Sequence, residues 1–200
     1  METQDKPIKI DRRAIRSKRL IVEAWRELVL EKEYKKISVS DIVERADIGR
    51  ATFYAHFDDK EDLGRFMFSK LLAQIEEEIQ ISLEESATQS ATQILVPSLA
   101  LFRIAVQKHR WFKEGATNPE SGLGMLIPPL VKRLEIELDK MDLPDAHDEI
   151  PRRMMATYLV SALIALITEW VITDMPESPE AMDAMYQTLA APTINRLLGA

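Results

Sequence analysis

A short stretch of the chain carries polar side chains whose types and spacing suit contact with nucleic acid: Arg50, Thr52, Tyr54, His56 and Lys60. Arginine and threonine can hydrogen-bond to base edges, whereas tyrosine, histidine and lysine are suited to phosphate oxygens. Ala51 and Ala55 lie among them, and such small side chains let a backbone approach DNA closely. These residue types predict base contacts by Arg50 and Thr52 and phosphate contacts by the others.

The sequence offers no comparable arrangement for catalysis. His56, His109 and His147 lie far apart without the spacing of metal ligands, and the chain has no cysteine. The glycine-rich phosphate-binding motifs and the nucleophile motif of hydrolases are also missing. We therefore expect no enzyme, no metal and no cofactor.

Two short helices are predicted to position the polar side chains. Ser38 and Asp41 have the spacing of a capping box, which predicts that a helix begins at Ser38. The segment Asp47-Ile48-Gly49 then forms a tight turn, in which Asp tolerates a left-handed backbone and Gly49 caps the next helix. The second helix, residues 50–57, turns Phe53 and Phe57 inward and its polar face outward. This pattern predicts a helix-turn-helix.

The stretch from Ala46 to Leu63, ADIGRATFYAHFDDKEDL, resembles the TetR family of bacterial transcriptional repressors. The pattern T-x-Y-x-H-F at Thr52, followed by Lys60-Glu61 and Leu63, carries the resemblance, which extends over residues 12–66. It implies an all-helical, ligand-binding body that dimerises through its last two helices. The family usually has Gly where Asp47 stands and Ser or Thr where Gly49 stands, so the phosphate contact of that hydroxyl is missing here.

Charge is divided unevenly along a chain of net charge −7. Residues 1–70 carry 16 Lys and Arg against 14 Asp and Glu, whereas residues 71–200 carry 10 against 19. A mildly basic N-terminal part favours nucleic acid as its partner. The basic run of residues 6–19 predicts phosphate or minor-groove contacts, with Lys18 and Arg19 helping Ser40 to fix the register on phosphates; a solvated helix face is the alternative.

The predicted fold is all-α, with a DNA-binding domain over residues 1–59 and a helical body over residues 60–200. Residues 1–10 form an arm, and a first helix over residues 11–32 has a buried side listed here: Ile15, Leu20, Val22, Trp25, Leu28 and Val29. Asp58-Asp59 caps a long helix that reaches Glu85 and is the natural lever for any signal between the two domains; a passive spacer is the alternative.

The body is predicted to contain four further helices. Residues 86–92 form a loop, and the helix over residues 94–108 is interrupted or bent near Pro97. Trp111-Phe112 introduces a break before a loop over residues 115–124, and the next helix begins at Pro128-Pro129 and ends near Met141. Residues 143–150 connect it to a helix over residues 151–173 that is apolar on nearly every side. A last helix begins at Pro179 and is kinked or restarted by Pro192.

Two adjacent C-terminal helices with this much apolar surface predict a homodimer through a four-helix bundle. The candidate interface residues are Leu159, Leu163, Leu166, Met182, Leu189 and Ile194. The alternative is a large monomer core. A two-fold dimer also matches a palindromic operator in double-stranded DNA.

Large apolar residues of the body are candidates for a pocket that binds a small apolar or amphipathic effector. The candidate ligand-binding residues are Phe102, Trp111, Phe112, Met125, Met155, Tyr158 and Trp170. The alternative for each of them is a place in the ordinary core.

The function predicted from the sequence is a ligand-responsive repressor that an effector releases from its operator. The alternative is an interaction protein that has kept the fold without specific DNA binding. No signal peptide stands at the start, and Thr168 and Glu169 interrupt the most apolar run, so we expect a cytoplasmic protein that does not enter the membrane.

Overall fold

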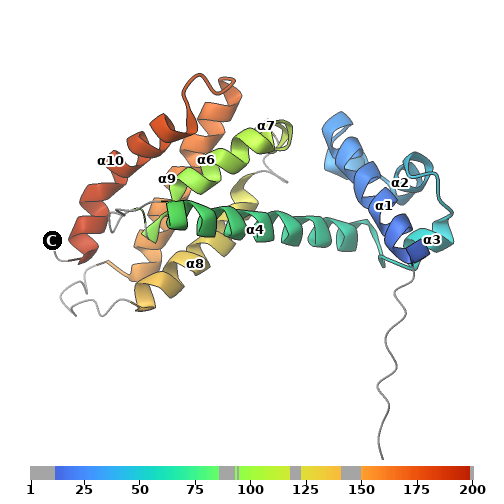
Figure 1. Ribbon diagram of the computed structural model, residues 1–200, viewed down its shortest axis with the longest axis horizontal. Helices are drawn as coiled ribbons and strands as arrows, with labels where there is room; N and C mark the ends of the chain where they lie inside the picture. Colours follow the sequence, from blue (N-terminus) through green and yellow to red (C-terminus); the bar gives the residue numbers. More distant parts are fainter. Residues whose placement is uncertain (1–11, 86–92, 94, 118–122, 141–149, 199–200) are drawn as a thin grey trace, which may run out of the picture. The chain divides into compact units, whose positions relative to one another are not determined.

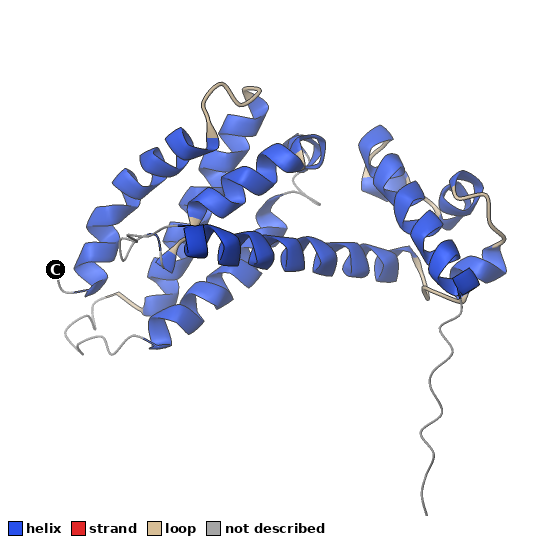
Figure 2. Cartoon of the chain, viewed as in Figure 1, coloured by secondary structure: helices blue, strands red, loops and turns tan. Residues whose placement is uncertain are grey.

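The computed structural model describes residues 12–85, 93, 95–117, 123–140 and 150–198. All the regular structure of these residues is helical, so the predicted all-α class is confirmed (Figure 2). The chain divides into two compact units, residues 1–70 and 71–200. The first unit contains α1 (Arg12–Glu31), the 3-10 turn η1 (Tyr34–Lys36), α2 (Val39–Arg45), α3 (Arg50–Tyr54) and the beginning of α4 (Lys60–Glu85) (Figure 1).

The first unit has a single apolar core, formed by side chains from each of its helices. Its buried members are Ile21, Ala24, Trp25, Leu28, Ile37, Ile42, Val43, Ala46, Phe53, Phe57 and Leu63. The buried face of α1 passes through Ile21, whereas Ile15 is 57% exposed, so its predicted burial is wrong. Three apolar residues in a row, Leu20 to Val22, made the position of that face ambiguous in the sequence.

The helix starts of this unit follow the predicted local chemistry. The Ser38 hydroxyl accepts the Asp41 backbone N–H, and the Asp41 carboxylate accepts the Ser38 N–H, which completes the capping box. Gly49 is the N-cap of α3. At the start of α4, Asp62 N–H donates to the Asp59 carboxylate at 2.6 Å. These predictions are confirmed, although α3 ends at Tyr54, earlier than expected.

The boundary between the two units falls inside α4 and not at its first residue. Leu63 is buried in the first core, and Phe66 and Met67 pack against that core. Leu71 and Ile75 are the first buried α4 residues of the second unit. The first turns of α4 therefore belong to the unit that contains the helix-turn-helix.

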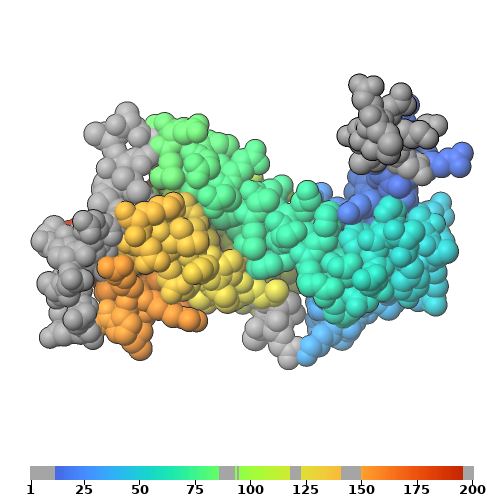
Figure 3. Space-filling view, turned by 90° about the horizontal axis from the view of Figure 1, so that it is seen from below, coloured from blue at the N-terminus to red at the C-terminus, as the bar shows by residue number. Residues whose placement is uncertain are grey.

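The second unit contains the end of α4, α6 (Ser98–Gln107), α7 (His109–Thr117), the 3-10 turn η2 (Leu123–Leu126), α8 (Ile127–Lys140), α9 (Arg152–Ile172) and α10 (Pro179–Leu198). Helix α9 packs against α6, α7, α8 and α10 and is the centre of this unit. Figure 3 shows the face on which α8 and the beginning of α9 lie side by side (yellow and orange). Helix α9 is long and apolar enough to cross a membrane, but half of its most apolar window is buried within the protein, as in a core helix.

Two predicted breaks in the body are wrong. Trp111 and Phe112 lie inside α7, and the preceding helix, α6, ends at Gln107 with Lys108 as its C-cap. Gly115 is helical too, and a Cβ there would lie 3.4 Å from Leu123, so this glycine permits close packing of η2. Pro192 lies inside an uninterrupted α10, on its exposed side, where water can serve the carbonyl that loses its backbone partner.

Two other features of the body follow the sequence. The chain is interrupted at Pro97, after which α6 begins at Ser98, and the helix that contains Pro128 and Pro129 has the predicted extent. The predicted arm, the loop over residues 86–92 and most of the connection over residues 143–150 lie outside the described residues.

Candidate nucleic-acid interface

Helix α3 separates an anchored side from an exposed polar side. Phe53 is fully buried, and its ring lies 5.9 Å from that of Phe57, centre to centre. On the other side Arg50 is exposed and Tyr54 is 54% exposed. Ala51 and Ala55 are exposed as well, while Thr52 is half-buried. The structure therefore brings together the residues predicted to face DNA, on a helix held from behind by two phenylalanines.

The turn before α3 places its left-handed residue at Asp47. The φ angle of Asp47 is 51°, in the region that favours glycine. Gly49 has φ −74° and ψ 151°, which any residue can adopt. A Cβ built on Gly49 would meet only the Thr52 hydroxyl oxygen, at 4.0 Å. The turn thus has room for the hydroxyl residue that the resemblance predicts there, and carries strain at Asp47.

A hydrogen bond joins the two helices of the motif on this exposed side. One terminal nitrogen of Arg50, Nη2, donates to the Ser40 hydroxyl oxygen at 2.6 Å. Ser40 lies in the first turn of α2, and both residues are exposed. A predicted phosphate-binding residue and a predicted base-reading residue are therefore in direct contact.

His56 is held by α1. Its Nε2 atom lies 2.7 Å from the Ser17 hydroxyl oxygen. The Ser17 hydroxyl also lies 3.1 Å from the carbonyl oxygens of Arg13 and Ala14, which can only accept. Serine has a single hydroxyl proton, which can go to one of these carbonyl oxygens or to Nε2, so the direction of the Ser17–His56 bond follows the tautomer of His56. His56 thereby fixes the end of the α3 segment against α1.

The two lysines predicted to bind phosphate already have partners inside the first unit. Lys18 Nζ lies 4.2 Å from the centre of the Phe66 ring and 5.3 Å from that of Phe57. Lys60 Nζ donates to the Tyr34 carbonyl oxygen at 3.2 Å and lies 4.5 Å from the centre of its ring. The Lys60 side chain is 15% exposed. Both ammonium groups thus stabilise aromatic packing in the unbound protein.

Arg19 differs from these lysines because its side chain is 67% exposed. Its partner is Glu23, one turn further along α1, at 3.7 Å. An exposed ion pair of this kind contributes little to stability, so its arginine is available to a phosphate.

Tyr34 is a residue of this unit that the sequence reasoning missed. Its ring packs edge-on against Trp25, and its hydroxyl lies over Gly64. Burial raises the pKa of the Tyr34 hydroxyl, and the nearby carboxylates of Glu61 and Asp59 raise it further. Its position in a three-residue 3-10 turn gives no periodic pattern from which the burial could have been predicted.

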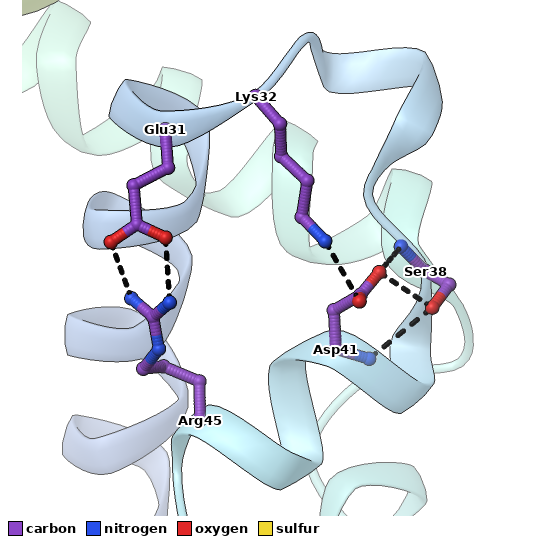
Figure 4. A network of polar contacts seen from close by, with 5 residues as sticks. All are labelled: Glu31, Lys32, Ser38, Asp41 and Arg45. Carbon is purple, nitrogen blue, oxygen red and sulfur yellow. Dashed lines mark hydrogen bonds and ion pairs between the residues drawn. The ribbon is translucent and has the colours of Figure 1, made fainter.

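Polar contacts near the far end of α1 hold both ends of α2 (Figure 4). The guanidinium of Arg45 donates to both carboxylate oxygens of Glu31, at 2.9 and 2.6 Å. Lys32 forms an ion pair with Asp41 at 2.8 Å. The hydrogen bonds from Lys32 and Ser38 hold the pKa of the Asp41 carboxyl well below its usual range. The sequence shows the capping box but not its contact with Lys32, which follows α1.

The predicted dimer residues occupy different environments within one protomer. Leu159, Leu163, Met182 and Ile194 are buried in the protomer's own core, so they offer no surface to a second copy. Leu166 is half-buried, and Leu189 is 62% exposed. Because α9 is apolar on nearly every side, the sequence could not tell which side faces inward.

Apolar residues other than the predicted ones are exposed on α9 and α10. They are Met154, Tyr158 and Ile172 on α9 and Met185 on α10, in addition to the predicted Leu189. The α9 residues recur at helical spacing, so they share one face of that helix.

The predicted ligand residues occupy different environments in the second unit. Phe102, Phe112, Met155 and Trp170 are buried in the core, and the rings of Phe102 and Trp170 meet edge to face at 5.3 Å. Trp111 is half-buried, whereas Met125 and Tyr158 are exposed.

A cavity of about 20 Å³ in the second unit is lined by other residues: Ile79, Leu95, Val96, Pro97, Leu101, Leu130, Arg133, Leu134, Val160 and Leu163. A volume of about 10–15 Å³ on this measure holds one water molecule, so this space is far smaller than a pocket for an organic ligand. Trp170 Nε1 is buried elsewhere in the unit without a hydrogen-bond partner among the described residues.

Comparison with known proteins adds relatives over both units. The family described as "Bacterial regulatory proteins, tetR family" matches residues 21–65, and "Transcriptional regulator C-terminal region" matches residues 113–191. The HTH-type transcriptional regulator YxbF of Bacillus subtilis is 28% identical over 187 residues, which are 90% of this chain. The dhaKLM operon transcriptional activator DhaS of Lactococcus lactis is 34% identical over 64 residues, or 32% of this chain. These matches span 46% and 34% of the length of the two relatives.

The fold is also that of a solved structure. The TetR transcriptional regulator of Streptococcus agalactiae superimposes with a TM-score of 0.62 at 22% identity, covering 90% of this chain and 96% of that one. These three proteins are named as transcriptional regulators, DhaS as an activator. The helix-turn-helix of the first unit, the helical second unit and both family matches lead to the same conclusion: the chain belongs to the TetR family of bacterial regulatory proteins.

Proposed function

We propose that this protein is a sequence-specific DNA-binding transcriptional regulator that responds to a small molecule. The observation that carries the proposal is the exposed side of α3, where Arg50 and the 54%-exposed Tyr54 stand opposite the buried Phe53. A short helix anchored in this way can enter the major groove. Arg50 and Thr52 then read base edges, while Ala51 and Ala55 permit close approach of the backbone.

Phosphate contacts fix the register of α3 in this proposal. Tyr54 and Arg19 are supported by their exposure. Lys18 and Lys60 must exchange an aromatic partner for a phosphate oxygen. This exchange is favourable because a charge-assisted hydrogen bond to a phosphate oxygen is stronger than the cation–π contact that it replaces. His56 must contact a phosphate with a ring that is already bonded to Ser17.

The regulator acts as a homodimer on a palindromic operator. The exposed apolar residues of α9 and α10, among them Met154 at 65% and Leu189 at 62%, support an interface with a second copy. A two-fold axis would place two copies of α3 in major grooves about 34 Å apart, which is one turn of the duplex.

An apolar or amphipathic effector binds the second unit in this scheme. Bound there, it favours a conformation in which the two α3 helices no longer match the half-sites, and α4 is the element shared by both units. Repression is what the family resemblance implies, whereas the relative DhaS is named as an activator. A reporter gene controlled by the operator in the bacterial cytoplasm shows directly whether the protein represses or activates transcription.

The test is selection of bound duplexes from a random double-stranded library by the full chain, followed by fluorescence anisotropy at 50 and 200 mM salt. Enrichment of a palindrome, with affinity that falls steeply as salt rises, is the expected result. Binding of all duplexes alike would contradict sequence-specific regulation. A folded dimer that binds no duplex at 50 mM salt would favour an interaction protein.

A further inference from the structure

The hydrogen bond between Ser40 and Arg50 points to a role for the serine beyond phosphate contact. We propose that Ser40 is a positioning residue that holds the Arg50 guanidinium ready to read a base, and so helps to determine which DNA sequence is preferred. The proposal rests on the proposed function of DNA binding. Its observation is the 2.6 Å bond from Arg50 Nη2 to Ser40 Oγ across the turn of the motif.

The platform that carries Ser40 is fixed at both ends. Ser40 stands between Ser38 and Asp41, which form the capping box of α2. The Asp41 carboxylate is also held by Lys32, the residue that directly follows α1, at 2.8 Å (Figure 4). The backbone of Ser40 therefore cannot move without breaking contacts that join α1 to α2, and its hydroxyl is a fixed acceptor for a long, exposed arginine.

Arg50 begins α3, directly after the Gly49 N-cap. Its guanidinium has five N–H donors, and the bond to Ser40 uses one of them. The remaining donors suffice for a bidentate contact with the O6 and N7 atoms of a guanine. Ser40 accepts in its bond with Arg50, so its own hydroxyl proton stays free to donate to a phosphate oxygen.

A side chain that is already ordered in the free protein loses less conformational entropy when it binds DNA. An arginine that is free in solution loses rotamer freedom when it binds a base, at a cost that preorganisation reduces. Ordering one such side chain corresponds to about a two- to twelve-fold change in affinity. Loss of Ser40 should therefore lower the ratio of affinity for the preferred duplex to affinity for unrelated duplexes by about that factor, beyond the equal loss on all duplexes that a missing phosphate contact causes.

The experiment is a double-mutant cycle with the full chain. Ser40→Ala, Arg50→Ala and the double variant are titrated by anisotropy against the duplex that the wild type selects from a random library, and against a scrambled duplex. Ser40→Thr keeps the hydroxyl and should retain the wild-type preference. Ser69→Ala is the control, because within the described part of the chain the Ser69 hydroxyl bonds to the Phe66 carbonyl of its own helix and to no other group.

Positioning predicts that Ser40→Ala lowers the ratio of specific to scrambled affinity in the wild-type background and has no effect on it in the Arg50→Ala background. If Ser40→Ala lowers the affinity for both duplexes by the same factor, or lowers the affinity ratio equally in the wild-type and Arg50→Ala backgrounds, Ser40 does not act through Arg50 and the proposal is overturned. If the wild type selects no sequence, the proposed function fails first. If it does select one and Ser40→Ala keeps the same preference, only the role of Ser40 fails.

Discussion

The Tyr34 hydroxyl lies so close to Gly64 that a Cβ added to the glycine would be 3.3 Å from it. The same Tyr34 ring packs edge-on against Trp25 of α1, at 5.5 Å between ring centres. Gly64 is therefore not a defect in the long α4 helix. Its missing side chain lets the first turns of α4 rest on an aromatic pair that belongs to the helix-turn-helix unit.

Gly64→Ala tests this contact. Alanine favours the helix by about 1 kcal/mol, but the crowding of Tyr34 by the new methyl group should cancel that gain or exceed it. In a Tyr34→Phe background the crowding atom is gone, so the same substitution should raise the free energy of unfolding by about 1 kcal/mol. Urea unfolding of the wild type, the two single variants and the double variant measures the difference. Equal effects in the two backgrounds would contradict a contact between the two residues.

Asp47→Gly should stabilise the first unit. Asp47 has φ 51°, and a residue with a Cβ in that region costs about 1 kcal/mol relative to glycine, partly offset by the greater entropy of glycine in the unfolded chain. We expect a small rise in the melting temperature. Glu44→Gly introduces the same residue in the interior of α2 and should lower the melting temperature. A fall for Asp47→Gly as well would mean that the aspartate side chain contributes more than its backbone costs.

Gly49→Ser should also stabilise the motif, because the N-cap of α3 has extended backbone angles and open space around its Cα. A capping hydroxyl improves on glycine by a few tenths of a kcal/mol, and the stiffer unfolded chain adds about 0.4–1 kcal/mol. Gly49→Ala separates these effects, since it stiffens the chain without a hydroxyl. The added hydroxyl should also donate to a DNA phosphate, so the serine variant should have a higher affinity for every duplex. A serine variant no more stable than the alanine variant would exclude a capping role.

The Asp41 carboxyl should make stability depend on pH. Its pKa is lowered in the folded protein by hydrogen bonds from Lys32 and Ser38, so folding favours the ionised form. This stabilisation is complete above the unfolded-state pKa of about 4 and is lost as the pH falls below it. Asp41→Asn should therefore lower the melting temperature at pH 7 more than at pH 3. Glu44→Gln, an exposed neighbour in α2, serves as the control, and parallel curves for wild type and Asp41→Asn would contradict the prediction.

Arg50→Ala and Tyr54→Phe should weaken DNA binding in different ways. Loss of a base contact costs about 1–3 kcal/mol on the preferred duplex only and relaxes the preference at one position. Loss of the tyrosine hydroxyl should weaken binding to all duplexes alike, without changing the selected sequence. Competition by the preferred and a scrambled duplex measures both. Arg65→Ala removes a 67%-exposed arginine of the same unit and is the control for charge alone.

Local chemistry explains why the helix-turn-helix could be predicted from the sequence. The capping box at Ser38, the N-cap at Gly49 and the inward Phe53 each depend on neighbours a few residues away. Contacts between distant segments left no such pattern. The Ser17–His56 bond, the Tyr34–Gly64 contact and the Arg45–Glu31 pair join residues that only the fold brings together.

The body was harder to predict for a related reason. Where a helix is apolar on nearly every side, as α9 is, composition cannot separate the inward Leu159 and Leu163 from the outward Met154 and Tyr158. Gly115 shows the converse: a residue typical of loops lies inside a helix because Leu123 packs against it.

The bond between His56 and Ser17 also provides a spectroscopic reporter. The chain contains three histidines, so a proton NMR spectrum of imidazole rings has few signals to assign, and one of them comes from the junction of α1 with the α3 segment. Ser17→Ala should shift that signal and identify it. Titration with DNA or with a candidate effector would then show, without any added label, whether that junction keeps its geometry while the protein binds.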